Sequence, residues 1–207
     1  MTMDTDEKPT TDAVVKKPKK LGQPSASEET ASKYPDMELC QKIHRLTTKQ
    51  TLPLSKEERQ AVFDEIAKEL ENPSLYRHVA ETAKPMDLEL LGDKELEEME
   101  TKHKRTMEEL EAKVEDAKES AGDMEVMEAR MEIARFAAKS LSEKEALEAY
   151  GKLIDLPKIS SGKKIDALME TSRVASFYGD TQKSDEYIAK VSCVLFLFVA
   201  VCNRSAV

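Results

Sequence analysis

The chain has 207 residues, of which 40% are hydrophobic, 35% are charged and only 5% are aromatic, with no tryptophan and six glycines. These proportions predict one domain of ordinary size with a modest core, and they weigh against an all-β fold or a glycine-rich nucleotide-binding loop. The formal net charge of −9 argues against a nucleic-acid partner, because binding phosphates requires a concentrated basic face.

The cysteines indicate a reducing compartment. Cys40, Cys193 and Cys202 are odd in number and lack the close spacing of a metal or redox motif. The N-terminus is acidic and polar, whereas a secretory signal would have a basic start and an apolar run. We therefore expect a cytoplasmic and nuclear protein.

Residues 1–32 are predicted to be a disordered tail. They consist mainly of Thr, Ser, Lys, Pro and Glu and show almost no apolar periodicity, so they cannot bury enough surface to offset the entropy of ordering. Lys16, Lys17, Lys19 and Lys20 form a short basic cluster around Pro18. The cluster has three readings, which are a nuclear import signal, a weak electrostatic contact and a solvated tail, and we favour the last.

Residues 33–92 carry the pattern of short helices. The first begins at Pro35 and ends within residues 47–53, and the last ends before Pro85. An apolar knot at residues 86–91 precedes Gly92. The apolar sides of these helices comprise Met37, Leu39, Cys40, Ile43, Leu46, Val62, Phe63, Ile66, Leu70, Leu75, Tyr76, Val79 and Ala80.

The middle helix of this region has a well-defined start and stop. Ser55 and Glu58 have the spacing of a capping box, in which each side chain bonds the other residue's backbone N–H. Asn72 and Pro73 end the helix, since proline cannot continue it. The sequence thus predicts a helix from about residue 56 to about residue 71.

Residues 93–121 are predicted to form one long, charged helix. A single narrow apolar stripe recurs at steps of three and four, and Glu, Lys and Arg occupy the other sides. Such a stripe is too thin to form a core by itself. Its members are Leu96, Met99, His103, Met107, Leu110, Val114 and Ala117.

Residues 122–191 are predicted to form two helical hairpins. Gly122 interrupts the long helix, and a capping box of Ser142 and Glu145 begins the second helix of the first hairpin. The two hairpins start near Met124 and Lys163, a separation typical of helical-repeat proteins. The predicted fold is therefore all-α, with hairpins of tetratricopeptide-like repeat type preceded by a long charged helix and a disordered N-terminal tail.

Residues 192–207 differ from everything before them. Residues 193–202 form an unbroken apolar run with β and membrane character, but a membrane-spanning helix needs about 20 residues. We favour an aggregation-prone or mispaired terminus over a membrane anchor.

No constellation in the sequence predicts catalysis. Cys40 and His44 lie one helical turn apart, but no further ligands are spaced to complete a metal site, so we interpret them as packing residues. His78 and His103 are interpreted as surface or helix-end groups. We expect no catalytic, cofactor-binding or metal-binding residues, no cofactor and no small-molecule substrate.

Two further patterns are interpreted as structural. Residues 160–164, Ser-Ser-Gly-Lys-Lys, are similar to the end of a phosphate-binding loop but lack its earlier glycine. The glutamates of the long helix are interleaved with Lys and Arg, which is typical of a solvated helix with weak ion pairs rather than a Ca²⁺ loop. These glutamates are Glu95, Glu97, Glu98, Glu100, Glu108, Glu109 and Glu111.

Several segments in order resemble a known family. They are Tyr34-Pro35-Asp36-Met37, the acidic segment 108–119, the segment 129–136 (Ala-Arg-Met-Glu-Ile-Ala-Arg-Phe), Lys144-Glu145-Ala146-Leu147 followed by Tyr150, Lys164-Ile165-Asp166, and Phe177-Tyr178. Over roughly residues 34–190 the chain resembles the N-terminal half of the 26S proteasome non-ATPase regulatory subunit 6 family, the Rpn-seven type of lid subunit.

The resemblance implies a non-catalytic scaffold in the regulatory particle, which prepares ubiquitylated proteins for degradation, and partners among the other lid subunits. Family members continue through further repeats into a C-terminal PCI module. The resemblance therefore implies a product truncated before that module, with a terminus from Ser192 that does not match the family.

Three alternatives remain from the sequence. A signalosome-type subunit shares the repeat and PCI plan, and sequence beyond Val191 would discriminate the two. A tail-anchored membrane adaptor would use residues 193–202 as its anchor, although we do not expect a membrane partner. An enzyme is the weakest alternative, because no set of acids, bases or nucleophiles converges.

Overall fold

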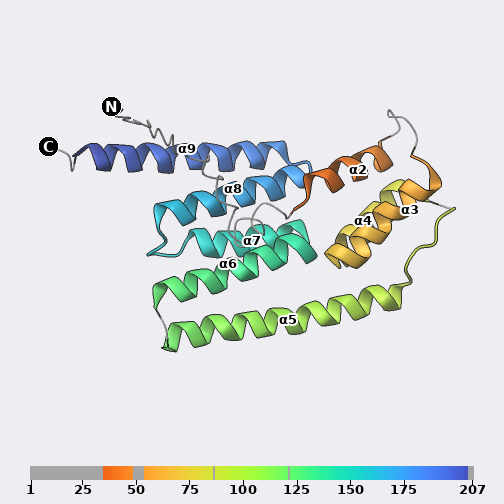
Figure 1. Ribbon diagram of the computed structural model, residues 1–207, viewed down its shortest axis with the longest axis horizontal. Helices are drawn as coiled ribbons and strands as arrows, with labels where there is room; N and C mark the ends of the chain where they lie inside the picture. Colours follow the sequence, from red (N-terminus) through yellow and green to blue (C-terminus); the bar gives the residue numbers. More distant parts are fainter. Residues whose placement is uncertain (1–34, 49–53, 86, 121, 205–207) are drawn as a thin grey trace, which may run out of the picture.

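The computed structural model describes residues 35–48, 54–85, 87–120 and 122–204, with side chains described up to residue 196. Within these residues it contains helices and no strand, which confirms the predicted all-α fold (Figure 1). The predicted tail and its basic cluster lie outside the described residues. The helices are α2 (Met37–Thr47), α3 (Lys56–Glu65), the π-helix η1 (Ile66–Leu70), α4 (Pro73–Ala83), α5 (Asp93–Ser120), α6 (Asp123–Ser140), α7 (Glu143–Ile154), α8 (Ser161–Phe177) and α9 (Thr181–Arg204).

Both predicted capping boxes are present and set the starts of their helices. The Ser55 hydroxyl accepts from the backbone N–H of Glu58 at 3.1 Å, and the Glu58 carboxylate accepts from the N–H of Ser55 at 2.8 Å. Ser142 and Glu145 exchange the same two bonds at the start of α7. Each cap satisfies N–H groups that the first helical turn leaves without partners.

Helices α2, α3, η1 and α4 form an N-terminal bundle with its own core. The rings of Phe63 and Tyr76 meet edge to face, with centroids 5.1 Å apart. The core is completed by Leu96 of α5 and Phe177 of α8, which come from distant parts of the sequence. Its buried members are Leu39, Val62, Phe63, Ile66, Ala67, Leu70, Leu75, Tyr76, Val79, Leu96 and Phe177.

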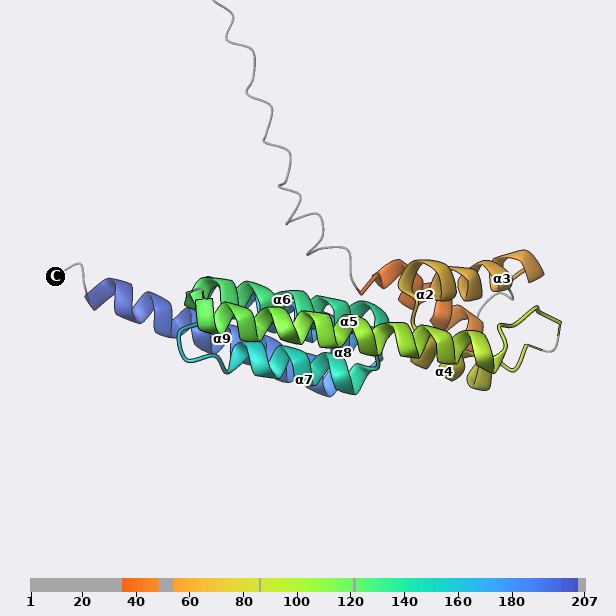
Figure 2. The same cartoon turned by 90° about the horizontal axis from the view of Figure 1, so that it is seen from below.

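Helices α5 to α9 form a helical array in which each helix packs against the next one along the chain (Figures 1 and 2). Alanine is frequent in the core of this array, so neighbouring helices can approach closely. The buried members are Leu110, Val114, Met127, Met131, Ile133, Ala134, Ala137, Ala138, Ala146, Ala149, Tyr150, Leu153, Ala167 and Val174.

A buried polar network ties three consecutive helices of the array together. Glu170 of α8 accepts from Arg135 of α6 at 2.8 Å and from the hydroxyl of Tyr150 of α7 at 2.7 Å. The hydrogen bond to Glu170 raises the pKa of Arg135, and burial raises the pKa of Tyr150. The network therefore holds a charged guanidinium and a neutral phenol at one carboxylate.

The N-terminal bundle and the array meet at a joint formed by the connection between α6 and α7. The side-chain amide of Asn72 donates to the carbonyls of Leu141 at 2.9 Å and Lys139 at 3.2 Å. Ser140 donates from its hydroxyl to the carbonyl of Leu70 at 2.8 Å. Because Asn72 and Ser140 are both buried, these bonds position the end of η1 against the start of α7.

The π-helix was not predicted, and α9 differs in extent from the predicted helix. Residues 66–70 continue the apolar side of α3, but the backbone widens there and ends at Glu71 in the left-handed region, with φ 48°. Helix α9 runs without a break across Ser192, where the sequence analysis placed a domain boundary, and it contains the apolar run 193–202. Within the described side chains, Val191 is buried just before this run, whereas Cys193, Leu195 and Phe196 within it are exposed.

Candidate interaction surfaces

Cys40 contributes to packing, whereas His44 does not, so the interpretation of both as packing residues is correct for Cys40 alone. The Cys40 thiol donates to the carbonyl of Phe177 at 3.3 Å, and burial raises the pKa of the thiol. His44 is exposed and lies 3.4 Å from the hydroxyl of Thr48. Among the described residues, no group of three His, Cys, Asp or Glu side chains is arranged to hold a metal ion.

His103 is a core residue, so its interpretation as a surface or helix-end group is wrong. Its side chain is 4% exposed, and its ring meets that of Phe136 edge to face at 5.6 Å. Neither ring nitrogen has a hydrogen-bond partner among the described residues. Burial lowers its pKa, which favours the neutral ring. His103 belongs to the apolar stripe of α5, and this position predicts its burial correctly because the stripe faces α6.

Four charged side chains of α5, Glu100, Lys102, Glu111 and Lys113, pair with residues outside the helix. Lys113 pairs with Glu132 of α6 at 3.1 Å, and Lys102 pairs with Glu71 at 2.6 Å. The only ion pair described between two α5 residues joins Lys118 to Glu115. The sequence predicted weak pairs along the helix itself, and most of the described pairs instead join α5 to residues outside it. Each exposed pair of this kind adds about 0 to 1 kcal/mol of stability.

The segment similar to a phosphate-binding loop is the start of α8. The Ser160 hydroxyl accepts from the backbone N–H of Lys163 at 3.4 Å as an N-cap. Ser160 therefore caps a helix, which agrees with the interpretation that residues 160–164 have a structural role and do not bind phosphate.

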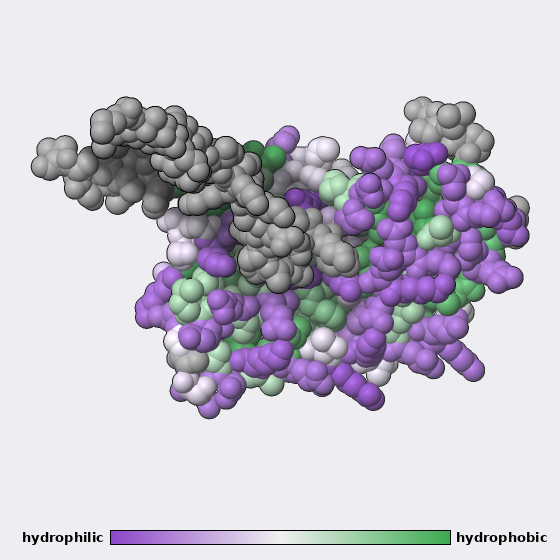
Figure 3. Space-filling view, in the orientation of Figure 1, coloured by the Kyte–Doolittle hydropathy of each residue, from purple (hydrophilic) through white to green (hydrophobic). Residues whose placement is uncertain are grey.

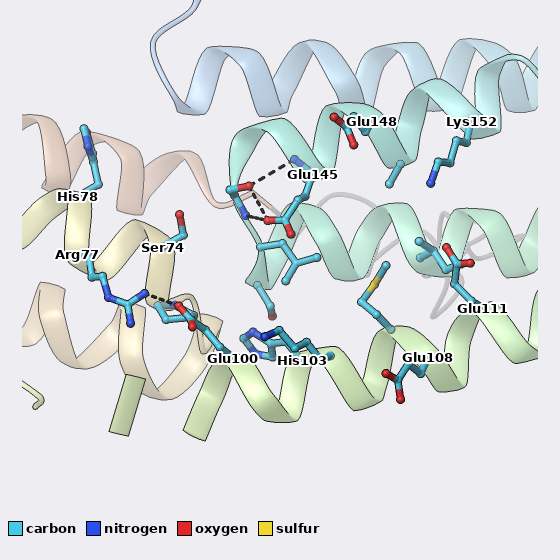
Figure 4. A pocket seen from close by; sticks show the side chains of 18 of the residues that line it. Ser74, Arg77, His78, Glu100, His103, Glu108, Glu111, Glu145, Glu148 and Lys152 are labelled. Atoms are coloured by element: carbon cyan, nitrogen blue, oxygen red, sulfur yellow. Dashed lines mark hydrogen bonds and ion pairs between the residues drawn. The ribbon is translucent and has the colours of Figure 1, made fainter. Parts of the chain in front are cut away.

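A groove of about 820 Å³ lies near the joint between α4, α5, α6 and α7 and is here called the inter-helix groove. Figure 4 shows side chains of α5 along one side and of α7 along the other. Its floor includes Met107, Ile133 and Ala149, together with the ring of His103. The floor is therefore apolar, whereas both sides carry charged residues.

Glutamates outnumber bases in the inter-helix groove. Arg77 pairs with Glu100, and Arg130 lies 3.8 Å from Glu111, so these bases are already engaged. Glu145 is held in the cap of α7 (Figure 4). The charged lining comprises Arg77, Glu81, Glu100, Lys104, Glu108, Glu111, Arg130, Glu145, Glu148 and Lys152.

A second surface is the outer face of α9, defined by Ile188, Leu195 and Phe196. Their exposed fractions are 47%, 46% and 75%, which is high for apolar side chains. Ser184 and Val191 are buried, although their spacing of three and four residues from Ile188 and Leu195 places them on the same side of the helix, so exposure on this side varies along α9. Hydrophilic residues cover much of the face seen in Figure 3, with apolar patches between them. Single exposed apolar side chains are common on proteins, but several grouped on one helix are typical of a contact surface.

A membrane-spanning helix is not found in the part of the chain that the structure describes, since none there combines sufficient length and apolarity.

Comparison with family models gives a match to 26S proteasome subunit RPN7 over residues 93–196, about half of the chain. A search of the curated proteins finds no match. The matched range starts at the first residue of α5 and ends within α9, so it covers the helical array. The N-terminal bundle lies outside it, although the sequence resemblance was traced from residue 34.

Proposed function

The chain belongs to the 26S proteasome subunit RPN7 family, and from this membership we propose that it acts as a non-catalytic scaffold in the lid of the regulatory particle. The finer assignment, to regulatory subunit 6, is supported by the acidic segment 108–119 and by the segment 129–136. In this role the chain supports ubiquitin-dependent protein degradation in the cytoplasm and nucleus, and its partners are other lid subunits.

The outer face of α9 is the observation that carries this proposal. The matched region builds a row of helices, and its last helix leaves Ile188, Leu195 and Phe196 exposed. In a helical-repeat scaffold each unit buries its apolar side against a neighbour. A lid partner that packs against this face buries these side chains, and their burial drives the contact.

The test compares matched charge insertions in the full chain. Ile188→Glu combined with Phe196→Glu places two carboxylates on the α9 outer face. Met124→Glu is the control, since Met124 of α6 is 57% exposed and lies on another helix. Each variant is expressed with an affinity tag in cells, and the lid subunits that co-purify are quantified by mass spectrometry.

We expect lid subunits to co-purify with the wild-type chain and with Met124→Glu. The double variant loses them by about tenfold or more, because each buried unpaired charge opposes association. Absence of lid subunits from the wild-type sample contradicts the proposed function. Retention of lid subunits by the double variant contradicts the role of the α9 outer face.

A further inference from the structure

We propose that the inter-helix groove binds the basic cluster of this chain's own N-terminal segment, Lys16-Lys17-Pro18-Lys19-Lys20. The proposal does not depend on membership of the lid. It assigns an occupant to the groove and a role to the most basic stretch of the sequence.

The charge of the groove is the first argument. Its lining holds six glutamates and four arginines or lysines. Glu81 of α4 and Glu108 of α5 make no hydrogen bond or ion pair within the described residues, and Glu148 only approaches Lys144 at 3.9 Å. Lys104 and Lys152 line the same groove and also make no ion pair within the described residues, so the argument rests on the excess of two carboxylates over the bases. This excess beside an apolar floor favours a cationic occupant, since the attraction is stronger near a low-dielectric surface.

The composition of the N-terminal segment is the second argument. Val14 and Val15 directly precede the lysine cluster, so residues 14–20 present apolar groups followed by four positive charges. The groove offers the complementary arrangement, with an apolar floor at Met107 and Ile133 and glutamates along both sides (Figure 4).

Length is the third argument. Pro18 disfavours a helix, and an extended segment of five residues spans about 16 Å. Along α5 the groove runs from Glu100 to Glu111, which corresponds to about 17 Å of helix. The lysine cluster therefore matches the length of the α5 side.

Reach is the fourth argument. The described chain starts at Pro35, close to α2, whose Cys40 contacts the carbonyl of Phe177. The neighbouring Tyr178 donates from its hydroxyl to the carbonyl of Leu141, which lines the groove. Roughly 14 residues connect Leu21 to Pro35 and reach up to about 46 Å when extended. The tether therefore allows the cluster to enter the groove of its own molecule.

The experiment is zero-length carbodiimide cross-linking of the full chain, which joins lysines to carboxylates in contact, followed by mass spectrometry. A mixture of isotopically light and heavy chains separates links within one molecule from links between molecules. In low salt we expect the tail lysines to link within one molecule to Glu111 and Glu148. These links disappear in about 1 M salt, where the screening length is about 3 Å.

Matched variants locate the contact. Glu81→Gln combined with Glu108→Gln removes the two unpartnered carboxylates, and we expect links from the tail lysines to Glu111 and Glu148 to fall about fivefold. Glu98→Gln combined with Glu109→Gln removes exposed carboxylates of α5 that do not line the groove, and it leaves these links unchanged. Circular dichroism checks that all variants remain folded.

Two outcomes overturn the proposal. In the first, the tail lysines link to Glu98 and Glu109 as often as to Glu111 and Glu148, and this result would identify a solvated tail. Alternatively, about half of the links to the groove in an equal mixture join a light chain to a heavy chain, as random pairing requires, which identifies a second copy as the occupant.

Discussion

The N-terminal bundle and the helical array are built in different ways. The array packs each helix against its neighbour in sequence, with alanines such as Ala134 and Ala137 at the contacts. The bundle relies on large side chains such as Phe63 and Tyr76. Its core also includes Phe177, the last residue of α8 in the array. The comparison teaches that the array can form from local contacts, whereas the bundle is complete only when the array is in place.

The largest expected effect separates the two cores directly. Phe63 is 1% exposed, and Phe63→Ala removes its ring from the bundle core, so we expect a loss of about 4 kcal/mol in the free energy of unfolding. Urea unfolding measures this loss. Amide hydrogen exchange followed helix by helix then shows protection lost first in α2, α3 and α4.

Leu153→Ala is the matched change in the array, since Leu153 is fully buried. We expect a loss of about 3 kcal/mol, with protection reduced in α6, α7 and α8 and also in the dependent bundle. If Phe63→Ala lowers protection in α7 and α8 as much as in α4, the two regions unfold as one unit and the comparison fails.

A smaller effect is expected at the joint. Asn72→Ala removes the N-cap of α4 and both bonds to the connection between α6 and α7, so we expect a loss of about 2 kcal/mol. Chemical denaturation monitored by circular dichroism measures it. Ser74→Ala is the control, because Ser74 is exposed on the first turn of α4. A change within about 0.5 kcal/mol for Asn72→Ala would show that the joint contributes little.

The smallest expected effect is the pH dependence that arises from His103. Burial lowers the pKa of the folded state, and it outweighs the opposite influence of Glu71 and Glu100. The unfolded chain then binds a proton more readily than the folded chain, so stability is full above about pH 6.5 and decreases as the pH falls toward the folded pKa.

His103→Leu keeps the site apolar and removes this titration. We expect the stability of the wild type to decrease more than that of the variant between about pH 7 and pH 5, measured by urea unfolding at each pH. Parallel profiles for the two proteins would show that His103 does not titrate in the unfolding reaction.

Most helix positions were predictable because their signals are local. Two helix starts are predicted by capping boxes that span four residues each, Ser55 with Glu58 and Ser142 with Glu145. The buried side of α5 is predicted by apolar residues spaced three and four apart. The π-helix η1 was missed because its apolar residues continue the same spacing as α3. Asn72 was recognised as a helix stop, but its bonds to residues 139 and 141 have no signal in the local sequence.

The candidate surfaces were less predictable than the helices. Glu81 and Glu108 belong to different helices, and only packing brings them to one groove. The apolar character of residues 193–202 was evident, yet the exposure of Leu195 and Phe196 depends on how far α8 extends alongside α9 (Figure 1). Arg135 and Glu170 lie 35 residues apart, so their pairing also follows from the arrangement of helices.

The sequence by itself determined that this protein is all-helical, where its helices begin, and which side of each helix avoids water, because capping and amphipathic periodicity act over a few residues. Only the tertiary structure decided that His103 meets Phe136, that Asn72 joins two regions, and that glutamates from α4, α5 and α7 share one groove. These features depend on which helices become neighbours, and that choice is made by the fit of whole faces rather than by any single segment.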